Sequence, residues 1–236
     1  MFEPLRSLLS FLFLLACLHL SAVPGYTADN EYMTLVRQVQ QRYQRLHSLE
    51  CTFDQTSQSG SRSKEATGTA RFYRTGTGKN GSGIMRWNYE TPTKQTIIND
   101  GKELSMYTPD DRQMIITSLE TMESDITYAI LTGSRTLAHV FVIMPPDPGF
   151  QLTPPPAGLR SVQLLPKEPH PQVHRLQLWV GPDQTVRVLL MEDHMGALTE
   201  LRLSAIRVNR LPAGDSRQIQ ALLELHVPPG TEIIRQ

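Results

Sequence analysis

The residue types that could carry out catalysis are scattered along this chain of 236 residues. His170 and His174 are four residues apart, a spacing that places two metal ligands on one face of a helix. Pro171 lies between them, and proline breaks the interior of a helix, so we expect an exposed loop there. The sequence therefore predicts no metal site and no cofactor.

The candidate nucleophiles and carboxylate pairs are explained by local structure. Ser134 lacks the strand–turn–helix context of a nucleophile elbow. Cys51 begins a strand-like segment, where it is expected to pack as a small hydrophobe. Asp110 and Asp111 follow Pro109 in an expected turn, where aspartate is common. We therefore predict no catalytic residue, and the protein is not expected to be an enzyme.

Binding chemistry is better represented, in one strand-like segment. Met85, Trp87 and Tyr89 are spaced two apart, so the three large side chains leave the same face of a β-strand. Such a bulky face needs an apolar cover. It either packs into an ordinary core or lines a cavity for an apolar ligand, and both remain open from these residues alone.

Two segments with helical spacing could provide that cover. Apolar residues recur every three or four positions over residues 30–49, and Leu35 and Val39 belong to this stripe. A second helix is expected over residues 118–131, with Ile126 and Ile130 on its apolar face. A further helical turn is expected over 136–141.

The rest of the chain alternates apolar and polar residues as antiparallel strands do. The pairs Gly60–Ser61 and Asp100–Gly101 indicate hairpin turns. The proline-rich region 145–171 is expected to form long loops around a short strand. Together with the segment of Met85, the expected strands are 51–56, 66–73, 94–99, 103–107, 113–117, 162–164, 176–180, 186–190, 201–203 and a final strand over 222–227. This predicts an α+β fold, with one sheet curled around helices in a single domain.

The first residues resemble a secretory signal peptide. Arg6 precedes an apolar run over residues 8–20, and small residues follow, so we expect cleavage after Gly25 or Ala28. The run is shorter than the about 20 residues of a membrane-spanning helix. The expected organisation is a signal peptide over 1–28 and one domain over 29–236.

Cys17 offers an alternative at the N-terminus. Residues 14–17 resemble a bacterial lipobox, which would make Cys17 a lipidated first residue. The apolar run continues past Cys17, which favours an ordinary signal peptide. After its removal only Cys51 remains, so no intramolecular disulfide is possible.

The charge of the chain excludes some partners. Lysine and arginine total 23 and aspartate and glutamate total 23, so the formal net charge is zero. With no basic run, neither nucleic acid nor an anionic membrane surface is expected as the main partner.

Short motifs along the chain occur in an order that is similar to one family. They are Phe53-Asp54-Gln55, Phe72-Tyr73-Arg74, Met85-Arg86-Trp87-Asn88-Tyr89, Asp100-Gly101, Tyr107-Thr108-Pro109, Leu131-Thr132-Gly133 and Val227-Pro228-Pro229-Gly230. Together they resemble the LolA-type periplasmic carriers of outer-membrane lipoproteins. The resemblance covers nearly all of the chain after the expected signal peptide.

The resemblance implies an unclosed antiparallel β-barrel, or half-barrel, covered by a helical lid. Its interior would shield the acyl chains of lipoproteins that an inner-membrane ABC-type (ATP-binding-cassette) release complex delivers. The cargo would pass to an outer-membrane receptor lipoprotein, and the carrier would work as a periplasmic monomer. The lining expected for this cavity is Met85, Trp87, Tyr89, Leu35, Val39, Ile126 and Ile130.

The resemblance also implies a role for Arg74. In this family an arginine at the end of the second strand holds the lid through hydrogen bonds, and the accepting backbone would lie near residues 130–133. Two departures from the family pattern are Thr75 with a glycine-rich stretch to Gly83, where proline is usual, and the long region 145–171. The alternative functions are an outer-membrane receptor lipidated on Cys17 and a periplasmic module that senses lipoproteins.

Overall fold

The computed structural model describes residues 25–75, 82–118, 126–133, 135–212 and 214–236. Residues 1–24, which contain Cys17 and most of the expected signal peptide, lie outside the described residues. Gly25 to Ala28 form the first turn of the first helix, α1.

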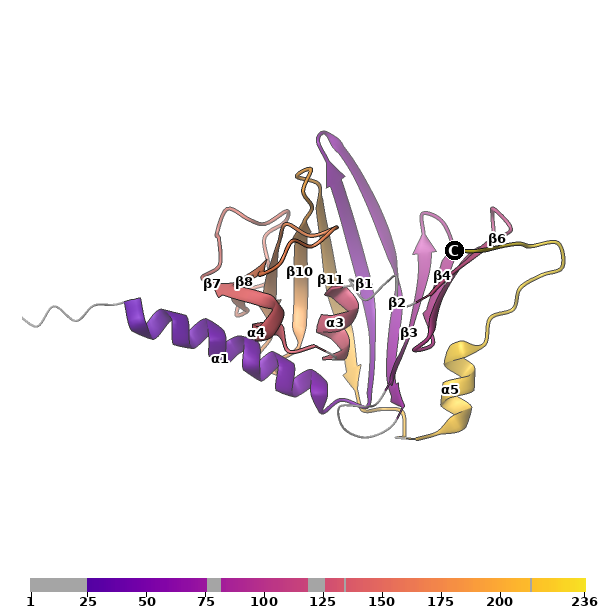
Figure 1. Cartoon of the computed structure of the whole chain (residues 1–236), viewed down its shortest axis with the longest axis horizontal. Coiled ribbons are helices and arrows are strands. Elements are labelled where there is room, and N and C mark those ends of the chain that lie inside the picture. Colours follow the sequence, from indigo (N-terminus) through magenta and orange to yellow (C-terminus); the bar gives the residue numbers. More distant parts are fainter. Residues whose placement is uncertain (1–24, 76–81, 119–125, 134, 213) are drawn as a thin grey trace, which may run out of the picture.

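One large, curved sheet forms the framework of the molecule (Figure 1). Its order is β12-β6-β5-β4-β3-β2-β1-β11-β10-β9-β8-β7, so that neighbours along the chain are mostly neighbours in the sheet. Adjacent strands are antiparallel, apart from the parallel pair β12 and β6. The strands are β1 (Ser48–Ser59), β2 (Arg62–Thr75), β3 (Ser82–Thr91), β4 (Gln95–Asn99), β5 (Glu103–Thr108), β6 (Gln113–Ser118), β7 (Phe141–Met144), β8 (Arg160–Pro166), β9 (Arg175–Val180), β10 (Val186–Glu192), β11 (Leu198–Val208) and β12 (Glu232–Arg235).

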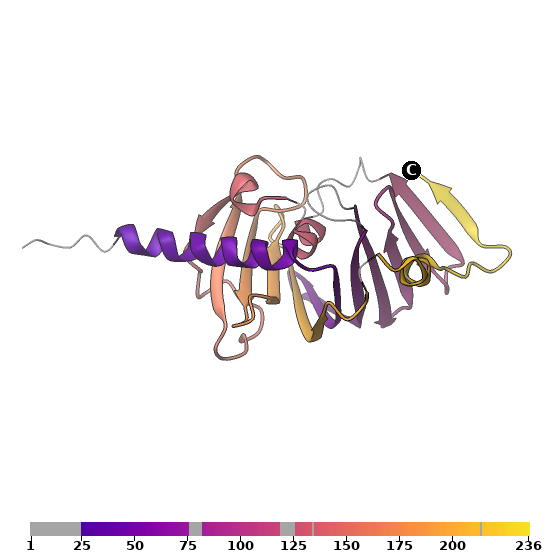
Figure 2. The same ribbon diagram turned by 90° about the horizontal axis from the view of Figure 1, so that it is seen from below.

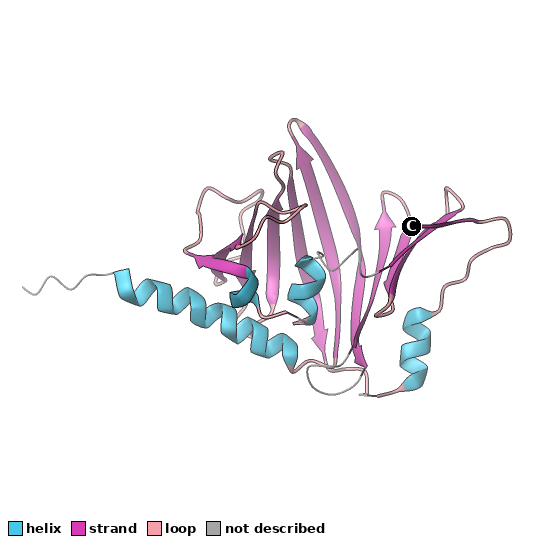
Figure 3. Cartoon of the chain, in the orientation of Figure 1, coloured by secondary structure: helices cyan, strands magenta, loops and turns pink. Residues whose placement is uncertain are grey.

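Among the residues that the structure describes, three helices cover the concave face of this sheet, and a fourth lies outside it (Figures 2 and 3). We call α1 (Gly25–Gln44), α3 (Ile126–Thr132) and α4 (Leu137–Val140) the lid. The helix α1 contacts α3, α4, β7 and β8, whereas α5 (Ser216–Leu223) packs against β3. Because β7 and β12 end the sheet without meeting, the protein is an unclosed half-barrel with a helical lid, as the family resemblance implied.

The main core lies between the lid and the concave face. The apolar stripe of α1 is buried there, including Leu35, Val39 and Tyr43. The helix ends at Gln44, five residues earlier than predicted. It ends because Ser48 pairs with Tyr73, so the chain must already be extended as the first residue of β1.

The convex face carries a second, separate cluster under the proline-rich region. Phe150 from this region packs with Trp179, Val188 and Leu190. The Gln177 side chain donates hydrogen bonds to the carbonyl oxygens of Asp147 and Phe150. The long loop is therefore bound to the back of β9 and β10.

The prediction of a final strand over 222–227 is wrong. Leu222 belongs to α5, which begins after Asp215, whose side chain accepts a hydrogen bond from the Arg217 backbone. Leu222 is buried against Tyr73 and Ile84. These two strand residues point to the convex face, because they alternate with inward-facing neighbours along β2 and β3. Helical spacing of Ile219, Leu222 and Leu223 thus prevails over the local alternation that suggested a strand.

The strands β7 and β12 were not anticipated. The segment 136–141 does contain the predicted helical turn, α4, but Phe141 already pairs with Pro166 as the start of β7. The last strand, β12, follows Pro228, Pro229 and Gly230 and adds to β6. Both are four residues long, which leaves little pattern to recognise.

Candidate ligand-binding cavity

A cavity of about 370 Å³ remains between the concave face and the lid. Its walls come from six strands and α3, and the lining residues include no charged side chain. They are Gln55, Met85, Trp87, Tyr89, Ile97, Asn99, Leu104, Met106, Thr127, Leu189, Met191, Thr199 and Leu201. A largely apolar lining of this kind suits an apolar ligand.

The predicted strand face of Met85, Trp87 and Tyr89 forms one wall of the cavity. The Phe53 ring braces this wall from β1, with its centroid 4.9 Å from both the Trp87 and the Tyr89 ring centroids, edge to face. Such aromatic pairs are stabilising beyond their buried area. The rings are therefore fixed against each other, and Trp87 and Tyr89 keep an open side toward the cavity.

Gly68 makes room for the Phe53 ring. A Cβ atom at this position would lie 2.8 Å from Phe53 Cζ and 2.1 Å from the backbone oxygen of Asn88. Neither distance is compatible with a side chain. The aromatic wall thus depends on a glycine on β2, opposite both Phe53 and Tyr89.

A few polar groups are placed on the apolar lining. The Tyr89 hydroxyl donates a hydrogen bond of 3.0 Å to Gln55 Oε1. Trp87 Nε1 donates to Met85 Sδ at 2.7 Å. The Asn99 side chain accepts from the Gly101 backbone and so stabilises the turn between β4 and β5. These groups are satisfied within the protein, and the cavity can accept a ligand without polar partners.

The four lid residues predicted to line the cavity are buried elsewhere. Leu35, Val39, Ile126 and Ile130 all lie in the main core and are not among the cavity-lining residues. In the form described here they pack against the sheet and each other, which closes the lid. Their contact with a ligand remains a prediction for a form in which the lid has moved.

The lining from the other half of the sheet was not identified from the sequence. Leu189 and Met191 on β10 pair with Leu201 and Thr199 on β11. Alternation along each strand shows which residues face inward, but only the curl of the sheet brings them opposite Trp87. Thr127 on α3 also lines the cavity, and its place on the lid was not apparent.

Arg74 joins β2 to the C-terminal ends of two lid helices, α1 and α3. Its Nη2 atom donates hydrogen bonds to the Thr132 carbonyl oxygen at 2.6 Å and to the Tyr43 carbonyl oxygen at 3.2 Å. Thr132 ends α3, and Tyr43 is one residue from the end of α1. The acceptor lies within the segment 130–133 that the family resemblance implied, and a functional role for this contact remains a prediction.

Gln40 forms a second connection, which sequence reasoning missed. Its side chain donates to the Arg135 carbonyl oxygen at 3.0 Å and accepts from the Leu137 backbone at 2.9 Å. Gln40 is 8% exposed, although its position resembled the polar side of the helix. A buried amide that satisfies two backbone groups binds α1 to the connection between α3 and α4.

Two buried groups near the lid are held in their neutral form. Burial raises the pKa of the Tyr43 hydroxyl, which accepts a hydrogen bond from the Val186 backbone. Burial also raises the pKa of the Cys51 thiol to about 12. A thiol with this pKa is protonated at neutral pH, so Cys51 packs in the core and is a poor nucleophile.

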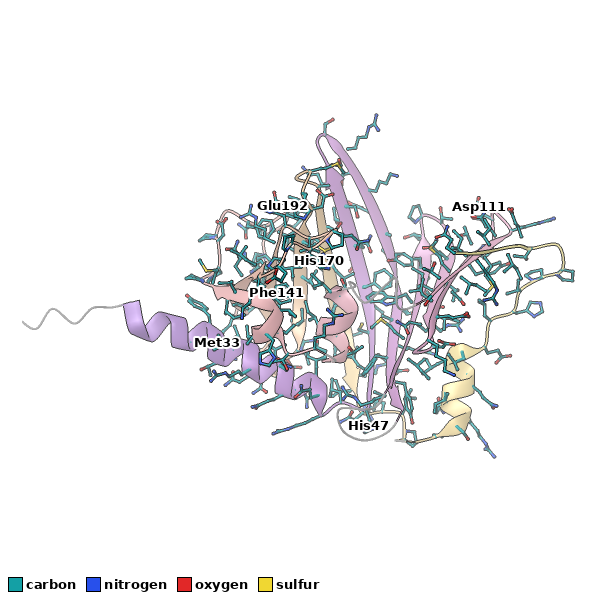
Figure 4. The ribbon with its side chains drawn as sticks, viewed as in Figure 1. Met33, His47, Asp111, Phe141, His170 and Glu192 are labelled. Atoms are coloured by element: carbon teal, nitrogen blue, oxygen red, sulfur yellow. The ribbon has the colours of Figure 1, made fainter. Side chains whose placement is uncertain are left out.

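The acidic turn at Asp111 lies apart from the loop histidines, which contact one another. Asp111 lies at the tip of the β5–β6 turn, away from His170 (Figure 4). His170 Nδ1 accepts from the Gln172 backbone, and His174 stacks edge to face with His194 at 5.8 Å. Over the described ranges, no group of three or more histidine, cysteine or carboxylate residues is placed to hold a metal ion.

The fold and the cavity define a β-sheet protein with a partly open apolar site beside a helical lid. The family model described as "Outer membrane lipoprotein carrier protein LolA" matches residues 44–216, and the chain belongs to this family. The part of the chain that the structure describes has no helix both long and apolar enough to span a membrane.

Relatives of this chain carry the name outer-membrane lipoprotein carrier protein. The one from Hahella chejuensis is 28% identical over 196 residues, covering 81% of this chain and 83% of its own. The one from Nitrosospira multiformis is 25% identical over 155 residues, covering 65% and 68%. An uncharacterized conserved protein from Thermus thermophilus shares the fold, with a TM-score of 0.51 at 10% identity, over 87% of this chain and 99% of its own.

Proposed function

We propose that this protein is a periplasmic carrier that binds the acyl chains of outer-membrane lipoproteins. It takes its cargo from an ABC-type release complex in the inner membrane and delivers it to a receptor lipoprotein in the outer membrane. Membership of the LolA family supports a carrier of lipoproteins. The observation that carries the proposal is the apolar cavity beneath a lid that hydrogen bonds connect to the sheet.

The physical task of such a carrier is to keep acyl chains out of water. Burial of one methylene group contributes about 0.8 kcal/mol, so one long acyl chain represents on the order of 10 kcal/mol. A cavity lined by Trp87, Met85 and the leucines of β10 and β11 removes much of that exposure. The protein performs no reaction in this role; it binds, carries and releases.

Release requires that binding is opposed by another interaction. In the closed form Leu35, Val39, Ile126 and Ile130 occupy apolar surroundings that the acyl chains need. Cargo displaces them, and the Arg74 contacts with Thr132 and Tyr43 are lost. Arg74 thus favours the closed form and lowers the affinity for cargo, which allows the cargo to pass to a receptor.

The substitution Arg74→Leu tests this role. It removes the hydrogen bonds to Thr132 and Tyr43, so the variant should bind a triacylated lipoprotein more tightly and release it poorly. The measurement is transfer of a radiolabelled lipoprotein from inner-membrane vesicles to outer-membrane vesicles, with uptake and delivery scored separately. We expect normal uptake and a delivery rate at least about tenfold lower, corresponding to about 1.4 kcal/mol.

Arg71→Leu is the matched control for this experiment. Arg71 lies on the same strand, its side chain is 51% exposed, and it pairs with Glu50. Its loss should leave both uptake and delivery unchanged, because a surface ion pair contributes little. Normal delivery by Arg74→Leu would show that the contact does not control release.

Two other outcomes of the same experiments would assign a different function. A purified protein whose intact mass includes a triacylated Cys17 would be the outer-membrane receptor. A protein that binds lipoprotein but never delivers it to outer-membrane vesicles would be a sensing module.

A further inference from the structure

The cavity stays open although the lid is closed. The four lid residues expected to be displaced by acyl chains are packed in the core. Arg74 and Gln40 both form their hydrogen bonds with backbone groups of the lid. Even so, a volume of about 370 Å³ remains beside Trp87. An apolar space of this size is available to a ligand without any movement of the lid.

The size of the cavity suits one acyl chain. An engineered apolar cavity of about 150 Å³ in another protein holds one benzene molecule. The volume here is more than twice as large. This is space for a single aliphatic chain, and it is too small for the three chains of a triacylated lipoprotein.

The shape of the cavity also suits a chain. Its lining extends from Leu104 and Met106 on β5 to Leu189 and Met191 on β10. These strands are six steps apart in the sheet. At about 4.8 Å per step the lining follows about 29 Å of the curved surface. This length is measured along the curved wall, since the curl of the sheet brings β10 opposite Trp87, and a flexible linear chain follows such a wall better than a compact ring system.

We propose that the closed form binds one linear acyl chain of a single-chain lipid, whether the lipid is a free fatty acid or a lysophospholipid. The inference rests on the proposed function in that it uses the same cavity. It adds a ligand class that enters without lid opening. The chain lies along Trp87 and Met106, and the head group remains at the cavity mouth, because no charged residue lines the interior.

Arg74 separates the two classes of ligand. A lipoprotein with three chains needs the open form, so each contact that favours the closed form lowers its affinity. A single chain fits the closed form and is not opposed by these contacts. It therefore stabilises the closed form and competes with lipoprotein for the protein.

The two tryptophans of the chain provide a direct test. Trp87 lines the cavity, whereas Trp179 is buried in the cluster on the convex face. Trp179→Phe leaves Trp87 as the reporter, and Trp87→Phe leaves Trp179. Each full-length variant is titrated with a brominated fatty acid, and separately with a brominated lysophospholipid. Both lipids are kept below their critical micelle concentrations, and quenching of tryptophan fluorescence is measured.

We expect both lipids to quench Trp87 in the Trp179→Phe protein, with saturation at one lipid per protein. Trp179 in the Trp87→Phe protein should not be quenched. Absence of Trp87 quenching by both lipids would overturn the proposal, as would quenching of Trp179. Quenching by only one lipid would also overturn it, because the head group and not the chain would then determine binding.

Arg74→Leu, added to the Trp179→Phe protein, distinguishes this proposal from the carrier function. The affinity for a single-chain lipid should change less than about twofold or fall, while that for a triacylated lipopeptide rises. If single-chain affinity rises as much as lipopeptide affinity, both ligands need the open form and the inference is wrong. If the lipopeptide does not bind at all, the carrier function fails, whatever the single-chain result.

Discussion

At the scale of single residues, the aromatic wall could be predicted, but its support could not. A period of two is enough to place Met85, Trp87 and Tyr89 on one face, because alternation is a property of any strand. The Phe53 ring passes over Gly68 and contacts two of these rings. This contact depends on the pairing of β1, β2 and β3. The whole sheet sets this strand register, so it cannot be predicted from the sequence of one segment.

The substitution Gly68→Ala should disturb this wall. Its Cβ atom would meet the Asn88 backbone as well as the Phe53 ring, so the strands must shift. We expect the free energy of unfolding to fall by about 1–3 kcal/mol, the usual range for overpacking. Urea denaturation measures the change.

Gly149→Ala is the control for Gly68→Ala. The nearest heavy atom to its added Cβ would be Asp147 Oδ1 at 3.3 Å, which is farther away than the atoms around Gly68 and belongs to a side chain and not to the backbone. A small change is expected here. Equal losses in the two variants would contradict the assigned role of Gly68.

At the scale of elements, the sequence predicted most strands and the helix α1. The helix predicted over 118–131 is confirmed only from Ile126, where α3 begins, because Ser118 ends β6 and residues 119–125 lie outside the described residues. The hairpin of β1 and β2 and the turn between β4 and β5 follow from Gly60 and from Asp100–Gly101. The error over 222–227 arose because a short alternation of apolar residues suggested a strand, whereas Leu222 and Leu223 end α5 and residues 224–227 are neither helix nor strand. Only the cap at Asp215 and the apolar partners on β2 and β3 decide for a helix. The link between α1 and α4 could not be predicted either, because it consists of hydrogen bonds between the Gln40 side chain and backbone groups.

Gln40→Ala should loosen the lid at this link. The change leaves the Arg135 carbonyl and the Leu137 amide without their side-chain partner, at a cost of about 1–3 kcal/mol. Amide hydrogen exchange at Leu137 should become faster, and affinity for a triacylated lipopeptide should rise, because the closed form is less favoured.

The exposed neighbour Gln41 provides the control on the same helix. Gln41→Ala should change neither hydrogen exchange nor affinity. If Gln40→Ala accelerates exchange but leaves lipopeptide affinity unchanged, the link is structural and has no part in cargo binding.

At the scale of the whole molecule, the sheet separates a site from its supports. The concave face holds the cavity and the lid, and the convex face holds two packed clusters, one under α5 and one under the proline-rich loop. The sequence indicated a curled sheet with helices on one side. It did not indicate that the proline-rich stretch 145–159 and the helix α5 would cover its back.

This separation predicts that stability and binding can be changed independently. Leu222 is buried against Tyr73 and Ile84, so Leu222→Ala should lower the free energy of unfolding by about 2–3 kcal/mol. Ligand-induced quenching of Trp87 should keep its midpoint, because the altered site lies on the opposite face. The control is Gln220→Ala, at an exposed position on the same helix, which should change neither the free energy of unfolding nor the midpoint. A shifted midpoint would show that the two faces are coupled.

The open ends of the sheet affect whether this protein associates with its own copies at high concentration. Any unclosed sheet offers unpaired backbone groups to a neighbouring chain, and long, flat, apolar edges aggregate. Here each terminal strand is four residues long: β7 runs directly into Pro145 and Pro146, and β12 carries Glu232 and Arg235. Short, charged or proline-bounded edges resist strand-to-strand association, so an open barrel can remain open without becoming the start of a fibril.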